Sequence, residues 1–250
     1  MAHSVEDVRR HYDGLSFGEF SYGDRRAGFY PLFDAFVATI NPESRVVDVG
    51  CGAGFWLDEF VRRGVAREQL LGLDLAPANV QRARERGHRA EVGNVLDLAQ
   101  PDAAFDAVFC AGVIHHTPDP RLAFRELVRI TRPGGHIYLA VYNRWHPYYY
   151  LVHRGAAPLR YVYWHHTKKA ADVAYRLARV AFQPLAWLAL GRFLDDRTAR
   201  TMFMDQVITP RAALFTKRTL RRYARECGCT VEAFRYNRYG LMLSALFRVS

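Results

Sequence analysis

Three glycines alternate with other residues in the segment Asp48-Val49-Gly50-Cys51-Gly52-Ala53-Gly54. The segment follows a β-branched run and precedes a helix-like run, which is the pattern of a strand, a tight turn and a helix. Glycines let the backbone approach a ligand closely, and the helix N-terminus presents free N–H groups. The G-x-G-x-G spacing differs from the G-x-G-x-x-G of dinucleotide enzymes. The loop alone therefore indicates either a nucleoside site or a structural turn.

A carboxylate stands at the end of the next strand-like run, residues 70–74. This residue, Asp74, follows Asp48 by 26 positions and could accept hydrogen bonds from both hydroxyls of a ribose. It could instead cap the helix that begins near Pro77, although Leu75 and Ala76 intervene. We favour the ribose role, because the glycine loop and Asp74 then indicate the same kind of ligand.

Strand-like and helix-like runs alternate through the first 142 residues, as in a parallel α/β sheet. Strands are expected at residues 45–49, 70–74, 89–92, 105–110, 136–142, 230–234 and 241–249. Helices are expected at residues 55–63, 77–87, from 119 to the Pro-Gly-Gly at 133–135, and from a Thr216 cap to 227. The sequence thus predicts a Rossmann-like, doubly wound α/β sheet, mostly parallel with an antiparallel C-terminal strand pair.

Aromatic residues and arginines crowd the chain after Asn143, which predicts a helical lid insertion. We expect residues 1–250 to form a single domain, with a cap at 1–40, the lid at 143–213 and a closing helix and strand pair at 214–250. The longest uncharged run of the lid has 12 residues, whereas a membrane span needs about 20. Most aromatic residues of the lid are expected to pack it onto the sheet.

Positive charge is concentrated in the second part of the chain. Residues 143–250 carry 19 of the 35 Lys and Arg residues but only 6 of the 25 Asp and Glu residues. One interpretation is an anionic partner, which could be a small molecule, an acidic membrane surface or RNA. A compositional preference for Arg over Lys explains the charge equally well. The lid residues expected to meet an anion are Lys168, Lys169, Arg176 and Arg179.

Residues 46–54 resemble the first motif of the class I S-adenosylmethionine (SAM) dependent methyltransferases. Residues 72–74, Gly-Leu-Asp, resemble the acidic second motif of that family. Residues 93–95 and 105–106 resemble its adenine-contacting and fourth-strand motifs. Residues 113–135, from Val-Ile-His-His to Pro-Gly-Gly, are similar to the branch that acts mostly on small molecules.

The resemblance implies SAM as the cofactor and S-adenosylhomocysteine as its product. The residues that it assigns to the cofactor site are Asp48, Gly50, Cys51, Gly52, Gly54, Asp74, Leu75, Asn94, Val95 and Cys110. The three glycines would border the methionine moiety, Asp74 the ribose and Asn94 the adenine amino group. Many relatives have Asp in place of Asn94, whose amide oxygen can still accept the adenine N–H.

Methyl transfer from a sulfonium is an in-line displacement, in which positioning and exclusion of water supply most of the catalysis. A base is needed only where the nucleophile arrives protonated. His115 and His116 are the candidate bases, because they lie in the loop where this fold places the transferred methyl. The alternative is that one histidine packs and the other bonds backbone. Tyr12, in a segment that resembles the family's cofactor cover, is a further catalytic candidate or a packed aromatic.

The four cysteines show neither metal-ligand nor disulfide spacing, so we expect no metal site and a reducing compartment. Cys51 and Cys110 are interpreted as small buried residues, and Cys227 and Cys229 as structural residues at a helix end. The first residues lack the apolar run of a secretory signal, which predicts a cytoplasmic protein.

The segment 110–116 lacks the residues of several better-defined methyltransferase branches. These are the clamp for an exocyclic base amine, the nucleophile for cytosine C5, the acidic hairpin for arginine and the acidic cluster for a catechol-type metal. The sequence therefore predicts an enzyme that methylates an O, N or C nucleophile of a small, partly apolar, anionic metabolite. Two alternatives stay open. One is a tRNA-modifying methyltransferase, because residues 114–116 also resemble wobble-uridine enzymes, and the other is a non-catalytic SAM-binding protein.

Overall fold

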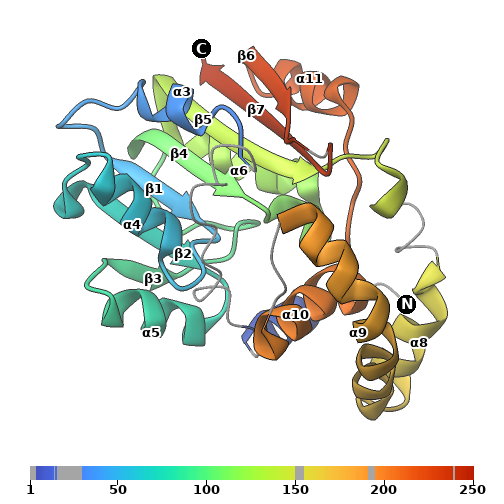
Figure 1. The fold of residues 1–250 in the computed structure, drawn as a ribbon. Helices are drawn as coiled ribbons and strands as arrows, with labels where there is room; N and C mark the ends of the chain where they lie inside the picture. The colour runs from blue at the N-terminus through green and yellow to red at the C-terminus, as the bar shows by residue number, and fades with distance from the viewer. Residues whose placement is uncertain (1–3, 14, 16–29, 150–154, 191–194, 239) are drawn as a thin grey trace.

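The computed structural model describes residues 4–13, 15, 30–149, 155–190, 195–238 and 240–250. Seven strands form one sheet in the order β3-β2-β1-β4-β5-β7-β6 (Figure 1). They are β1 (Val46–Val49), β2 (Leu70–Asp74), β3 (Ala90–Val92), β4 (Phe105–Ala111), β5 (Thr131–Tyr142), β6 (Cys229–Tyr236) and β7 (Met242–Val249).

The strand directions confirm the predicted sheet. Strands β1 to β5 run parallel, and β7 runs antiparallel to both β5 and β6. The strand order reverses at β1, which lies between β2 and β4. Sheets of this kind bind ligands beyond the carboxyl ends of the strands at such a reversal. The glycine loop follows β1 directly, so it lies at that place.

Helices cover both faces of the sheet. They are α3 (Phe33–Val37), α4 (Phe55–Arg62), α5 (Pro77–Glu85), α6 (Pro120–Ile130) and α11 (Lys217–Glu226), with the 3₁₀ turns η2 (Arg67–Gln69) and η3 (Ile114–His116). Helix α1 (Val5–Asp13) packs on α5 instead. One core joins α6 and α11 to alternate residues of β1, β2, β4, β5 and β7. A second, rich in aromatic residues, joins α3 and α4 to the other face. The parallel strands are therefore buried on both sides, as their apolar sequences require.

The predicted end of the helix at 120–135 and the predicted start of the fifth strand are wrong. Helix α6 ends at Ile130, and β5 begins at Thr131. Thr131 donates from its hydroxyl to the Leu127 carbonyl at 2.6 Å and lies opposite Phe105 in the sheet. The Pro-Gly-Gly segment then lies inside the strand, next to a register shift between Phe105 and Ala107. The β-branched Thr131 thus ends the helix before the proline is reached.

The segment 143–213 is mainly helical, as predicted. It contains α8 (Ala157–His165), α9 (Lys169–Leu190), α10 (Asp196–Phe203) and the π-helix η4 (Met204–Ile208). These lid helices lie together on one side of the sheet, near α1 (Figure 1). No described helix is both long and apolar enough to cross a membrane. The division into cap, lid and closing unit stays a prediction, as do the membrane contact and the cytoplasmic location.

The C-terminal elements follow the sequence pattern closely. The Thr216 hydroxyl accepts the Thr219 N–H at 3.1 Å and caps α11, as predicted.

Cys51 and Cys110 are buried, whereas Cys227 and Cys229 are half-buried free cysteines at the end of α11 and the start of β6. Cys51 and Cys110 are thus buried and Cys227 and Cys229 lie at a helix end, as predicted.

Candidate active site

The glycine loop has the left-handed backbone that its sequence predicts. Gly50, Gly52 and Gly54 have φ values of +82°, +53° and +84°. The N–H of Gly50 donates to the Leu73 carbonyl at 2.6 Å, which fixes the loop to the end of β2. A Cβ added at Gly50 would lie 2.1 Å from Val113 Cγ2, whereas one added at Gly52 would meet no atom within 4 Å. Gly50 therefore permits close packing, and Gly52 borders open space.

Asp74 connects the glycine loop to helix α5. Its Oδ2 accepts the Gly52 N–H at 2.8 Å, and its Oδ1 accepts the Ala76 N–H at 2.9 Å and the Asn79 amide at 3.3 Å. Burial raises the pKa of Asp74, and these hydrogen bonds oppose the rise. Asp74 does not cap α5 in the way that competed with ribose binding, because the N-cap is Ala76 and no side chain caps its helix N–H groups. A carboxylate offers about four acceptor positions, so Asp74 still has room for a hydroxyl donor.

Asp48 lies beneath the loop and is 1% exposed. Its Oδ2 has no hydrogen-bond partner among the described residues. Burial raises the pKa of this carboxyl, and the nearby charge of Asp74 raises it further. A buried acceptor of this kind is costly unless a donor meets it. The amino group of a methionine moiety would be such a donor, so the glycine loop and the two carboxyls fit SAM.

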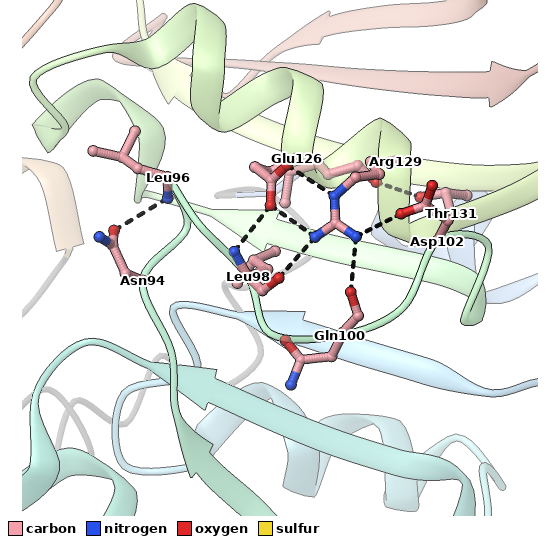
Figure 2. A network of polar contacts seen from close by, with 9 residues as sticks. Asn94, Leu96, Leu98, Gln100, Asp102, Glu126, Arg129 and Thr131 are labelled. Carbon is pink, nitrogen blue, oxygen red and sulfur yellow. Dashed lines mark hydrogen bonds and ion pairs between the residues drawn. The ribbon is translucent and has the colours of Figure 1, made fainter.

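The segment predicted to contact adenine forms a turn after β3. The Asn94 side-chain oxygen accepts the Leu96 N–H at 3.1 Å, so it stabilises its own turn (Figure 2). Val95 is buried, and Leu75 and Asn94 are half-buried. The adenine role of Asn94 and the cofactor contacts of Leu75, Val95, Cys51 and Cys110 stay predictions.

Arg129 of α6 fixes the segment that follows this turn, residues 98–102 (Figure 2). Its guanidinium donates to the Leu98 and Gln100 carbonyls, each at 2.8 Å, and to the Asp102 carboxylate at 2.8 Å. It also forms a two-point contact with Glu126, which in turn accepts the Leu98 N–H. The bonds to Glu126 and Asp102 raise the pKa of Arg129. Sequence reasoning missed this role, because the contacted carbonyls are backbone atoms and carry no side-chain signal.

Helix α1 bridges the cofactor side and the lid. Asp13 accepts the Ala78 N–H at 3.1 Å, at the start of α5. On its other side, His11 Nε2 lies 3.1 Å from the Met204 carbonyl of the lid. Burial lowers the pKa of His11 to about 4, so its neutral Nε2–H donates to that carbonyl. The helix thus fixes Tyr12 between the two parts.

Five residues from four separate segments meet beyond the carboxyl ends of β4 and β5. We call Tyr12, His116, Tyr142, Asp205 and Thr209 the acceptor cluster. The Tyr12 hydroxyl donates to Asp205 Oδ1 at 3.0 Å, and the Tyr142 hydroxyl donates to Asp205 Oδ2 at 3.2 Å. Thr209 lies 3.4 Å from the Tyr12 hydroxyl and 3.2 Å from His116 Nδ1. The side chain of Asp205 is 17% exposed and that of His116 is 6% exposed.

The two histidines have different surroundings. The His115 ring packs on Tyr142 with centroids 3.8 Å apart, while Tyr142 stacks on Tyr149 at 4.1 Å. His116 Nδ1 lies 2.8 Å from the Arg211 carbonyl. One histidine therefore packs and the other bonds backbone, as the alternative interpretation stated. The second ring nitrogen of His116, Nε2, lies 3.7 Å from Asp205 Oδ1, so this ring also faces the cluster.

Burial is the largest influence on the pKa values of the tyrosines and of His116 in the acceptor cluster. It raises the pKa of Tyr12 and Tyr142, and the charge of Asp205 adds to the rise. It lowers the pKa of His116, although Asp205 acts in the opposite direction. Neutral tyrosines and a neutral imidazole therefore surround the Asp205 carboxylate.

The structure brings together two of the three predicted catalytic candidates, Tyr12 and His116, and adds residues that the sequence did not indicate. Asp205 was missed because it lies in a π-helix, far in sequence from its partners and outside any motif. Tyr142 was assigned only to the fifth strand. Among the lid aromatics, Tyr149 is buried but Tyr161 is 60% exposed. Tyr150 lies outside the described residues, and the side chain of Trp187 is not described.

Comparison with known proteins supports the assignment of the central region. Residues 47–139 match a family model described as a methyltransferase domain. Over 108 residues the chain is 38% identical to a ubiquinone biosynthesis O-methyltransferase of Xanthomonas oryzae, covering 40% of this chain and 44% of that protein. Over 125 residues it is 31% identical to the 27-O-demethylrifamycin SV methyltransferase of Amycolatopsis mediterranei, covering 46% and 42%.

The fold agrees over a longer stretch. Magnesium protoporphyrin IX methyltransferase of Synechocystis, crystallised with bound SAM, superposes with a TM-score of 0.54 over 98% of this chain and 90% of that chain, at 14% identity. Residues 47–139 therefore resemble a methyltransferase domain, and the chain shares its fold with a methyltransferase that binds SAM. Its matches span less than half the length of the two curated relatives.

Proposed function

We propose that this protein transfers the methyl group of SAM to a nucleophile of a small, partly apolar molecule. The observation that carries the proposal is the glycine loop tied to Asp74, with open space at Gly52 and an unmet carboxylate oxygen at Asp48. The names of the two curated relatives, both O-methyltransferases of small molecules, support an oxygen nucleophile.

The residues of the loop would hold the cofactor, and the acceptor cluster would hold the second substrate. Gly50, Gly52 and Gly54 admit the methionine moiety, and Asp74 accepts from the ribose. Bound SAM supplies an electrophilic methyl group on a sulfonium. Val113 packs on Gly50 and is followed at once by η3, which contains His116. The loop and the acceptor cluster are thus joined by one short segment, which sets the direction of attack.

The acceptor cluster excludes water by aromatic packing. Tyr142 lies between the rings of His115 and Tyr149, and Tyr12 lies 5.4 Å from the His116 ring. The lid contributes Asp205 and Thr209, so residues of α1, β5 and the lid together form the walls of the site. A substrate held here would be partly desolvated before transfer. The predicted anionic character of that substrate stays a prediction.

Calorimetry with S-adenosylhomocysteine tests the cofactor assignment. The wild-type protein should bind it, and Asp74→Ala should lose binding, because the mutation removes the ribose acceptor and releases the loop. Asp102→Ala is a matched control, since this carboxylate is 80% exposed and lies on the far side of the Arg129 network. Unaltered affinity in Asp74→Ala would contradict the assignment.

The two alternative functions give other results with the same protein. A tRNA methyltransferase should bind bulk tRNA at low salt and lose affinity steeply as salt rises. A SAM-sensing protein should bind SAM and form no S-adenosylhomocysteine with any extract of its source. Methyl transfer to a small molecule, without tRNA binding, would support the proposed function over both.

A further inference from the structure

Asp205 brings a negative charge to the centre of the acceptor cluster. Its two oxygens each accept a tyrosine hydroxyl, from α1 on one side and from β5 on the other. It comes from η4, a π-helix turn that continues α10. Single π-helix turns often mark functional positions. Of the six acidic residues after Asn143, Asp205 contacts both Tyr12 and Tyr142.

The orientation of His116 follows from its backbone partner. The Arg211 carbonyl can only accept, so Nδ1 of the neutral ring carries the proton. Nε2 then has a lone pair, and it faces Asp205 Oδ1 at 3.7 Å, which is too long for a hydrogen bond. Two acceptors thus face each other with no proton between them. A hydroxyl placed beside both would supply the missing donor.

We propose that His116 and Asp205 bind a neutral hydroxyl group of the acceptor molecule, and that Asp205 takes its proton during methyl transfer. This inference rests on the proposed function and specifies its second substrate. The acceptor class is an alcohol or phenol that arrives protonated.

The step balances in atoms and charge. The acceptor oxygen forms a bond to the methyl carbon as the bond from that carbon to sulfur breaks, and the sulfur keeps the electron pair of the broken bond. The O–H bond of the acceptor breaks, its electron pair stays on the oxygen, and the proton moves to the Asp205 carboxylate. The products are a methyl ether, S-adenosylhomocysteine and a protonated Asp205, which then releases its proton to solvent.

The same charge disfavours a carboxylate as the methylated group. A carboxylate acceptor would place its negative charge beside Asp205 in a site that is largely desolvated, where like charges repel strongly. Two arginines close to η4 and Thr209 donate to backbone carbonyls, and neither is paired with Asp205 in the contacts described. Arg160 donates to the Val207 carbonyl and Arg211 to the Pro118 carbonyl. The site therefore selects methyl ether formation over methyl ester formation.

A purely structural role for Asp205 makes a different prediction. If the carboxylate only fastens the lid to Tyr12 and Tyr142, removing either partner loosens the site, and both variants change in the same direction. If the carboxylate faces the acceptor hydroxyl, Asp205→Asn removes a negative charge, whereas Tyr142→Phe removes a donor that shields it. The two variants then have opposite effects on the ionisation of a bound phenol.

The test uses 4-nitrophenol as the probe, because its phenolate has its own absorption band. The full-length protein is saturated with S-adenosylhomocysteine, and the bound probe is titrated between pH 5 and pH 10. Wild-type protein should keep the bound probe protonated to a higher pH than free probe. Asp205→Asn should lower the ionisation pH by about one unit or more, and Tyr142→Phe should raise it. Asp172→Asn, which removes a lid carboxylate paired with Arg200, should match the wild type.

The tyrosines and histidines near Asp205 whose pKa values are shifted do not titrate in this range. Burial raises the pKa of Tyr12 and Tyr142, and it raises the pKa of Tyr148 to about 12. His116 and its neighbour His11 have lowered pKa values and stay neutral. The absorbance change therefore reports the probe alone.

The possible outcomes separate the inference from the proposed function. Opposite shifts in the two variants support the inference. Identical ionisation in wild type and Asp205→Asn, or shifts in the same direction, would overturn it, as would a protein that binds S-adenosylhomocysteine but not the probe. Failure to bind S-adenosylhomocysteine at all would refute the proposed function first. If Asp205→Asn does not fold, the sign of the shift in Tyr142→Phe decides.

Discussion

Replacing Gly52 by alanine tests two reasons for glycine in this loop, which are its left-handed backbone and the space that it leaves for the cofactor. Gly52 has φ +53° and Gly64, at the end of α4, has φ +89°. An added Cβ meets no atom within 4 Å at either position. An L-residue in left-handed backbone costs roughly 1–2 kcal/mol. Each substitution should therefore lower the free energy of unfolding by about that amount, and the melting temperature by about 2–4 °C per kcal/mol for a chain of this size.

The two variants should differ in cofactor affinity. At Gly52 the new methyl group occupies the open space beside Asp74, where we place SAM, whereas Gly64 is exposed and lies at the far end of α4. We expect Gly52→Ala to weaken S-adenosylhomocysteine binding at least about tenfold, which is about 1.4 kcal/mol. Gly64→Ala should bind it as the wild type does. Isothermal calorimetry measures the affinity, and thermal unfolding measures the stability.

Equal affinity in the wild type and both variants would refute the cofactor position. Gly50→Ala provides an internal comparison, since its Cβ would lie 2.1 Å from Val113 Cγ2. Overpacking of this kind costs about 1–3 kcal/mol, in addition to the left-handed strain. This variant should therefore lose more stability than Gly52→Ala.

Substitutions at two further positions, Arg129 and His11, test the supports of the site. Arg129→Met removes the donors to the Leu98 and Gln100 carbonyls and should lower the free energy of unfolding by about 2–3 kcal/mol. Arg129→Lys should recover less than half of this lost free energy. An unchanged midpoint of urea unfolding in Arg129→Met would contradict the supporting role of Arg129. Burial lowers the pKa of His11 to about 4, whereas the ordinary pKa of histidine is about 6.5. Between these two pH values the unfolded chain binds more protons than the folded protein. The free energy of unfolding of the wild type should therefore fall by up to about 3 kcal/mol as the pH drops from about 6.5 to about 4. His11→Gln keeps a donor for the Met204 carbonyl and should make stability less dependent on pH, as measured by thermal unfolding at pH 7 and pH 4.5. An equal loss of stability between these pH values in the wild type and the variant would disprove the role of His11.

The sheet could be predicted because each of its strands has a local signature. The β-branched run 46–49 stops at Gly50, and the leucine-rich run 70–73 stops at Asp74. Asp119-Pro120 begins α6 with the predicted cap, since the Asp119 carboxylate accepts two backbone N–H groups. Such features depend on residues close together in the sequence, so they can be predicted from the sequence alone. The α6 to β5 boundary was misplaced because Pro133 was taken as the stop, although Thr131 leaves the helix earlier by pairing with a strand that is distant in sequence.

The cofactor side could be predicted for the same reason, and the acceptor side could not. Gly50, Gly52 and Asp74 belong to motifs at fixed spacing. The acceptor cluster instead depends on how the lid folds back over the sheet, which places Asp205 against Tyr12, 193 positions away in sequence. A single aspartate in a helical segment has no neighbour in sequence that marks it as functional. Only tertiary packing identifies it.

The net charge of the second part illustrates why composition is a poor guide to an individual site. Its excess of basic residues indicated an anionic substrate, yet five of those residues, Lys217, Arg218, Arg221, Arg222 and Arg225, lie on α11. There Lys217 and Arg221 lie over aromatic rings of β6, on the antiparallel edge of the sheet. The field at a desolvated point depends on the few charges beside it, because solvent screens the distant ones. At the acceptor cluster the nearest charge is the carboxylate of Asp205, so a basic lid and a neutral hydroxyl substrate are compatible.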